Sequence, residues 1–184
     1  GPVGAHTKRL SEKFKGTIAM LPEPLRRTLA QKIAAAEHPR ELVVDVLLAF
    51  QGHYGHLSDP ALEEAAGLLG MTPLELDELA TFYTFLYREP VGRYVIHVCD
   101  SLICWMNGYE PLRDHIGRRL GIAPGETTAD GLFTLLPVCC IGYCDRSPAV
   151  LVNGKAYGPL TPESLDALLA DLRTRAAHQT KPEA

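Results

Sequence analysis

The sequence predicts an α+β protein in which a small helical bundle precedes a sheet that carries packed helices. Two observations lead to this prediction. Apolar residues recur at helical spacing through the first half of the chain. Beyond that half the spacing becomes an alternation, as in Tyr94, Ile96 and Val98, which is typical of a strand. We therefore expect a flexible N-terminus, a helical bundle, a sheet domain and a disordered tail over residues 1–18, 19–88, 89–175 and 176–184.

The helices of the first half are marked by their end signals. Pro60 follows a predicted cap at Asp59, and Gly70 ends that helix. Thr72 and Glu75 have the spacing of a capping box at the start of the next helix. The aromatic run at 81–87 continues at helical spacing, so we expect it to belong mainly to the core, at the joint between the bundle and the sheet domain. Docking of a partner on one of its faces is the alternative. The expected helices span 24–37, 40–55, 58–70 and 72–87.

The second half is expected to have the order β-α-β-β-β-α. The hairpin turns at Asn153-Gly154, a pair that suits a tight turn with left-handed backbone. Thr161 and Pro162 predict the start of the last helix. The expected elements are strands at 94–99 and 131–140, a helix at 110–121, a hairpin within 149–160 and a helix from 161.

Charge and composition narrow the classes of partner. The 184 residues carry 18 Lys and Arg against 22 Asp and Glu, a net charge of −4, so we expect no nucleic-acid partner. The sequence has no apolar stretch long enough for a membrane helix, so direct membrane insertion is not expected. The start lacks the apolar core of a signal peptide, which favours the reducing cytoplasm. There, clustered cysteines favour metal or redox chemistry over structural disulfides.

The chemistry is concentrated in the five cysteines. Cys99 and Cys104 follow the first predicted strand, and Cys139, Cys140 and Cys144 follow the second. Four thiolates from two such loops can hold a [2Fe–2S] cluster or a structural zinc ion, and they can also be unliganded buried thiols. The absence of a Cys-x2-Cys pair disfavours a dithiol oxidoreductase.

Two features bear on the choice among these sites. Gly142 leaves room for backbone N–H groups to approach sulfur, which favours iron–sulfur over zinc. Cys139 and Cys140 are adjacent and should point to opposite faces of extended chain, so they should not both reach one cluster. The spacing alone leaves open which of the two does.

Residues 80–112, "ATFYTFLYREPVGRYVIHVCDSLICWMNGYEPL", and 125–169, which include "LPVCCIGYCDRSP", resemble one known family. It is the NuoE-type, thioredoxin-like [2Fe–2S] subunit of respiratory NADH:quinone oxidoreductase (complex I). The resemblance extends over roughly residues 20–175 and implies a helical bundle plus a thioredoxin-like [2Fe–2S] ferredoxin domain. Its C-x4-C…C-x3-C pattern implies that the four cluster ligands are Cys99, Cys104, Cys140 and Cys144. Cys139 would then be a buried thiol beside the cluster.

The resemblance also implies a function. The chain would be an electron-transfer subunit of an oxidoreductase, without catalytic residues of its own, and would exchange single electrons with FMN on a neighbouring subunit. That subunit would bind the FMN and NADH, because this chain has no G-x-G-x-x-G sequence after a strand. The complex would hold the chain at the inner face of the cell membrane.

Two alternatives stay open at this stage. One is the equivalent subunit of an NAD-linked hydrogenase or formate dehydrogenase. The other is a zinc-stapled interaction module without redox function. Near the cysteines, Trp105 is expected to shield the site from water, with contact to a partner subunit as the alternative. Asp100 and Asp145 are expected either to lower a cluster's potential or to be solvated.

Overall fold

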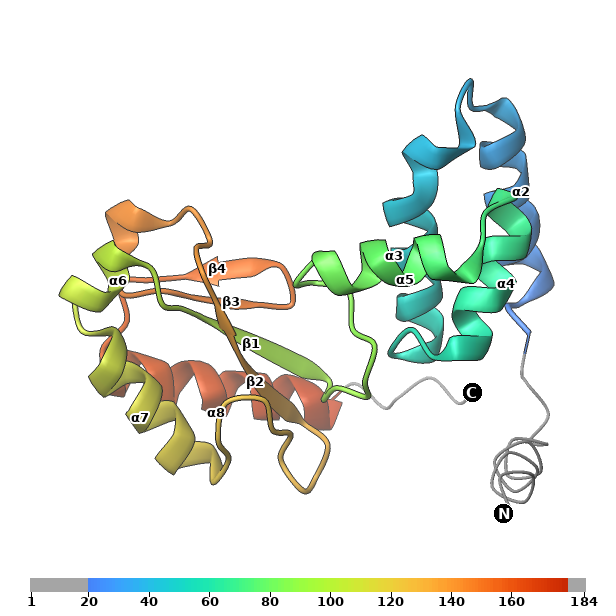
Figure 1. Ribbon diagram of the computed structural model, residues 1–184. Coiled ribbons are helices and arrows are strands. Elements are labelled where there is room, and N and C mark those ends of the chain that lie inside the picture. Colours follow the sequence, from blue (N-terminus) through green and yellow to red (C-terminus); the bar gives the residue numbers. More distant parts are fainter. Residues whose placement is uncertain (1–19, 179–184) are drawn as a thin grey trace, which may run out of the picture. The chain divides into compact units, whose positions relative to one another are not determined.

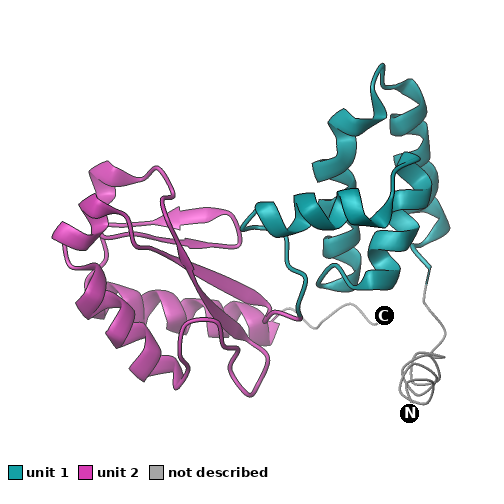
Figure 2. Cartoon of the chain, in the orientation of Figure 1, with its two compact units in different colours: residues 1–89 teal, residues 90–184 magenta. Residues whose placement is uncertain are grey.

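The computed structural model describes residues 20–178. The chain divides into two compact units, unit 1 within residues 1–89 and unit 2 within residues 90–184 (Figure 2). The predicted flexible segment at 1–18 lies outside the described residues, as does most of the predicted tail. None of the helices within residues 20–178 has both the length and the apolar character that crossing a membrane requires.

Unit 1 is helical, and its helices enclose one apolar core (Figure 1). Its elements are α2 (Glu23–Ala35), the 3-10 turn η1 (Pro39–Leu42), α3 (Val43–Tyr54), α4 (Asp59–Leu69) and α5 (Pro73–Phe82). Fully buried side chains come from α3, α5 and the α3–α4 connection, among them Leu47, Phe50, Leu57 and Leu76. The helix predicted to start at residue 40 begins as the 3-10 turn η1, and α3 itself follows that turn. The N-cap residue of α4 is Ser58, whereas the sequence predicted Asp59.

Helix α5 begins as predicted and ends earlier than predicted. The capping box is present, because the Glu75 N–H donates to the Thr72 hydroxyl at 3.3 Å and the Thr72 N–H donates to the Glu75 carboxylate at 2.9 Å. The helix stops at Phe82, because the following chain bonds elsewhere: the Tyr87 N–H donates to the Gln51 side chain at 2.6 Å. The prediction of an aromatic core segment is therefore wrong for Phe82, which is 76% exposed.

Unit 2 is a four-stranded mixed sheet in the order β2-β1-β3-β4 (Figure 1). Strand β1 pairs parallel with β2 and antiparallel with β3, and β3 forms the hairpin with β4. Helices α7 and α8 pack together on one face, where Ile96, Ile116 and Leu165 belong to one core. The strands are β1 (Tyr94–Cys99), β2 (Phe133–Val138), β3 (Val150–Val152) and β4 (Lys155–Tyr157), and the helices are α6 (Leu102–Met106), α7 (Tyr109–Leu120) and α8 (Pro162–His178), with a 3-10 turn η2 (Cys144–Arg146).

The hairpin turn and the last helix start where the sequence predicts. Asn153 and Gly154 both have positive φ, 45° and 83°. The Asn153 side chain also accepts from the Val95 N–H and donates to the Arg93 carbonyl, each at 2.8 Å. Two differences stand out: α6 is an unpredicted element, and α8 continues to His178, past the predicted tail start at 176. Two alanines with high helix propensity and a C-terminal histidine favour that extension.

Candidate iron–sulfur site

The two cysteine-bearing loops leave the same end of the sheet. Strand β1 ends at Cys99, which lies beside Val138, the last residue of β2. Because these two strands are parallel, α6 and η2 follow them at one edge, where they lie together (Figure 1). The Asn107 side-chain amide after α6 donates to the Ser147 hydroxyl after η2 at 2.9 Å, which joins the two loops directly.

The first pair of thiols is buried. Cys99 and Cys104 are each 2% exposed and pack with Ala149. Burial, followed by a hydrogen bond with Cys99, raises the pKa of the Cys104 thiol to about 11. Together, these buried sulfurs form the water-excluded side of the site.

The second pair, Cys140 and Cys144, is exposed and reaches the first. The Gly142 N–H donates to the Cys140 sulfur at 3.4 Å, and this bond lowers the pKa of that thiol, with smaller contributions from Ser101, Cys144 and Cys99. Partial loss of solvation, followed by the charge of Cys140, raises the pKa of Cys144. Cys99 interacts with both Cys104 and Cys140, and Cys140 also interacts with Cys144. The interaction between Cys99 and Cys140 therefore joins the two pairs into one group of four thiols.

The structure also separates the two adjacent cysteines. Cys140 interacts with Cys99 and Cys144. Both Cys139 and Cys140 are exposed. The expectation that Cys139 is a buried thiol is therefore wrong. Strand β2 lies at the edge of the sheet and ends at Val138, so the next residue has already left the sheet.

Two other expectations near the site can be compared with the structure. Trp105 does not shield the sulfurs as expected, because its side chain is 56% exposed. Successive helix residues are rotated by about 100°, so α6 turns Trp105 outward where it turns Cys104 inward. The Asp145 side chain is exposed, as a solvated carboxylate would be, and its Oδ2 lies 3.7 Å from Arg146 Nε.

Sequence reasoning did not identify Ser101, Asn107 and Ser147 as parts of this site. The signal for Ser101 is its place just before α6, at the N-cap, a position that serine favours. The bond between Asn107 and Ser147 has no local signal, since 40 residues separate them.

The donor set suits iron–sulfur chemistry. Four thiolates are the usual ligands of a [2Fe–2S] cluster, in which each iron takes two. Among residues 20–178, no group of three or more His, Cys, Asp or Glu side chains surrounds a point as one metal ion requires. A [2Fe–2S] cluster has two irons and therefore needs two pairs of sulfurs, not one group around a single point. The structure brings together such pairs, one buried and one exposed.

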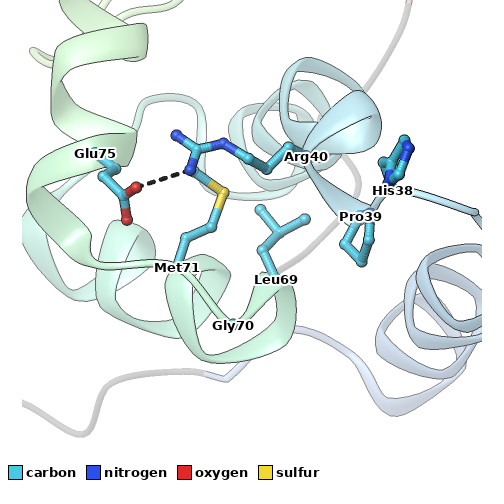
Figure 3. Close-up of a pocket in the computed structure, with 7 residues that line it drawn as sticks. All are labelled: His38, Pro39, Arg40, Leu69, Gly70, Met71 and Glu75. Carbon is cyan, nitrogen blue, oxygen red and sulfur yellow. Dashed lines mark hydrogen bonds and ion pairs between the residues drawn. The ribbon is translucent and has the colours of Figure 1, made fainter.

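A separate cavity of about 370 Å³ lies in unit 1 and is not part of the thiol site (Figure 3). It is open to solvent at the connections before α3 and α5, and the Arg40–Glu75 ion pair of 3.0 Å crosses it. Its lining contains no cysteine and consists of His38, Pro39, Arg40, Leu69, Gly70, Met71 and Glu75.

Comparison with known proteins agrees with this arrangement. Residues 29–173 match the sequence profile of the family described as thioredoxin-like [2Fe-2S] ferredoxin. The chain belongs to this family, which confirms the predicted α+β fold, the thioredoxin-like domain and the [2Fe–2S] cofactor.

The curated relatives are named as E subunits of one oxidoreductase. The E subunit of the NADH-quinone oxidoreductase of Pseudomonas aeruginosa is 38% identical over 150 residues, which are 82% of this chain and 90% of that protein. The E subunit of the Escherichia coli NADH-quinone oxidoreductase is 38% identical over 144 residues, which are 78% of this chain and 87% of that protein. These matches confirm the resemblance that the sequence motifs indicated.

A solved structure is also similar. The crystal structure of an NAD+-reducing [NiFe]-hydrogenase in the air-oxidized state matches with a TM-score of 0.61 and 30% identity over 71% of this chain. This chain spans only 23% of that hydrogenase chain.

Proposed function

We propose that this chain is the electron-transfer subunit of an NADH–quinone oxidoreductase, and that Cys99, Cys104, Cys140 and Cys144 hold its [2Fe–2S] cluster. The main support is the joining of two distant loops into one group of four interacting thiols. Such a cluster, when bound, accepts and returns one electron at a time, and we propose that the exchange partner is FMN on a neighbouring subunit.

Different residues of this chain have different roles in holding the cluster. Cys99 and Cys104 present sulfurs from the buried side and exclude water. On the other side, the Gly142 N–H donates to Cys140, a bond that stabilises negative charge on that sulfur. Asp100 and Asp145 flank the ligands with negative charge, which disfavours the addition of an electron and lowers the reduction potential. The potential is therefore set by opposing local effects.

The partner in this proposal is the subunit that binds NADH and FMN. The names of the relatives support it, because they place those proteins in an NADH-quinone oxidoreductase. The chain would then lie at the inner face of the cell membrane as a peripheral part of the complex. An NAD-linked hydrogenase is the second candidate host, supported by the hydrogenase structure. The proteins that purify with the chain distinguish these hosts.

The first test is the visible absorption spectrum of the purified protein, oxidised in air and then reduced with dithionite, with iron and zinc measured in the same sample. We expect broad bands that bleach on reduction and two irons per chain, as a [2Fe–2S] centre requires. A colourless protein with about one zinc per chain after anaerobic purification would instead support the zinc-stapled interaction module.

The ligand assignment is tested by a matched pair of neighbours. Cys140→Ala removes a proposed ligand, so we expect loss of the visible bands and of most of the iron. Cys139→Ala changes an exposed neighbouring thiol, so the iron content and spectrum should match those of the unaltered chain. The opposite pattern would assign the third ligand to Cys139.

A further inference from the structure

Ser101 lies in the first thiol loop, at the point where that loop passes the second. The pairing of β1 with β2 ends at Cys99 beside Val138, and one more bond continues it, because the Asp100 N–H donates to the Val138 carbonyl at 3.0 Å. Ser101 and Cys140 each come two residues after these paired strand ends. Parallel strands rise by the same distance per residue, so this register sets Ser101 at the level of Cys140.

The backbone of Ser101 is fixed, and its side chain is not used to cap the helix that follows. The residue is half-buried and extended, with φ −67° and ψ 158°, and its carbonyl accepts from the Trp105 N–H at 2.8 Å. A serine at an N-cap usually accepts from an N–H of the first helical turn. In α6, all of which is among the described residues, the Ser101 side chain makes no such bond. Its hydroxyl therefore serves another group.

That group is the Cys140 sulfur, which receives hydrogen bonds from both thiol loops. The Gly142 N–H, 3.4 Å from this sulfur, contributes most to lowering the pKa of Cys140, and the Ser101 hydroxyl adds to the effect. Gly142 belongs to the same loop as Cys140, whereas Ser101 reaches it from the other loop. A thiolate sulfur carries no hydrogen, so the hydroxyl is the donor in this bond.

A donor to a ligand sulfur affects the reduction potential. Reduction adds one negative charge, part of which resides on the ligand sulfurs. A hydroxyl hydrogen beside such a sulfur stabilises the reduced state more than the oxidised state, so it raises the potential. The carboxylates of Asp100 and Asp145 act in the opposite direction. Ser101 would therefore offset part of the effect of the carboxylate directly before it in the chain.

We propose that Ser101 raises the reduction potential of the [2Fe–2S] centre by donating its hydroxyl hydrogen to the ligand sulfur of Cys140. This inference rests on the proposed function and adds a residue that controls how readily the centre accepts an electron. The competing role is structural: the hydroxyl would only hold the two loops together, as the bond between Asn107 and Ser147 does.

The experiment uses the full chain with its cluster. Ser101→Thr keeps the hydroxyl, and Ser101→Val replaces it with a methyl group of similar size, so the two variants differ chiefly in the hydrogen bond. Ser147→Ala is the comparison for the structural role, because it removes a hydroxyl from the other side-chain bond between the same loops. Midpoint potentials come from a redox titration followed by the visible spectrum, and stability is measured by unfolding in urea.

We expect Ser101→Val to lower the equilibrium constant for reduction by roughly 3- to 10-fold, which is about 30–60 mV at about 59 mV per tenfold change for one electron. Ser101→Thr should stay near the potential of the unaltered chain. Equal potentials for Ser101→Thr and Ser101→Val would overturn the inference. An equal fall in Ser147→Ala would also overturn it, because looser loops would then explain the shift.

Two further outcomes complete the test. Loss of the cluster from Ser101→Val, with Ser101→Thr still loaded, would overturn the effect on the potential and assign the hydroxyl to retention of the cluster. Failure of the proposed function is distinguishable, because the unaltered chain itself would then lack iron or the bands that bleach on reduction. A normal spectrum whose potential is insensitive to the hydroxyl would overturn only the role of Ser101.

Discussion

Gly158 passes so close to the second thiol loop that a side chain has no room. A Cβ at this position would overlap the Arg146 carbonyl oxygen of η2 and would also lie 3.1 Å from Ala149 Cβ. The Leu160 N–H donates to the Pro148 carbonyl at 3.0 Å, a hydrogen bond that joins the segment after β4 to the chain that follows η2. Gly158 therefore helps to set the position of the loop that begins at Cys144.

Gly158→Ala should push η2 away from this segment. We expect the free energy of unfolding to fall by about 1–3 kcal/mol, as for other overpacked positions, and iron bound per chain to fall with it. Gly67→Ala is the control, because its added Cβ meets no atom within 4 Å inside α4, where alanine is favoured over glycine. Chemical denaturation and iron analysis of both variants give the measurement. Normal iron content in Gly158→Ala would contradict this role.

Asp166 on α8 gives unit 2 a pH-dependent contact. Its carboxylate accepts from His115 at 3.0 Å and from Arg119 at 2.9 Å, both on α7. The hydrogen bond with His115, followed by the charge of Arg119, lowers the pKa of Asp166 below its ordinary value of 3.8. The contribution to stability is therefore fully present above pH 3.8 and is lost as the pH falls through the lower, folded-state pKa.

Asp166→Asn should be less stable than the unaltered chain at pH 7, and the difference should shrink below about pH 4. Unfolding in urea at pH 7, 4, 3 and 2 measures this. A difference that stays constant over this range would contradict the charge-dependent account and would indicate packing alone.

At the scale of elements, the hairpin turn combines a backbone requirement with side-chain bonds. Asn153 holds a positive φ and also bonds to the start of β1 through both ends of its amide. Asn153→Gly keeps the turn and loses the bonds, which should destabilise unit 2 by about 1–3 kcal/mol. Asn153→Ala loses the bonds and also strains the left-handed backbone, at roughly 1–2 kcal/mol more. Thermal unfolding should rank Asn above Gly above Ala; equal stability of Gly and Ala would exclude the backbone effect.

Elements with local determinants could be predicted from the sequence, and the rest could not. The Thr72–Glu75 capping box and the Asn153-Gly154 turn each depend on residues within a few positions, so their patterns are sufficient. The end of α5 depends on Gln51, which lies 36 residues from its partner Tyr87. The same holds at the site: the family pattern implied Cys140, whereas the exposure of Cys139 depends on β2 ending at Val138 instead of continuing to residue 140 as predicted.

For the whole molecule, two separate cores predict two separate responses to loss of the cluster. Core residues of unit 1, such as Phe50, and of unit 2, such as Phe133, belong to different clusters of apolar contacts. Metal binding contributes folding free energy to the part that supplies the ligands. Removing iron with a chelator under reducing conditions should therefore lower amide protection in the loops after β1 and β2 and leave α3 unchanged. Hydrogen exchange measured by mass spectrometry checks this, and equal loss of protection in α3 would contradict it.

The parallel pairing of β1 with β2 also has a consequence for biogenesis. On the ribosome, Cys99 and Cys104 emerge well before Cys140 and Cys144, and a whole crossover helix, α7, lies between them. The two pairs meet only after that helix has folded back and the strands have aligned, with Cys99 beside Val138. Cluster insertion is therefore expected after translation of this segment, into a sheet that has already formed. Variants that slow the β1–β2 pairing should accumulate as iron-free chains even where every ligand is intact.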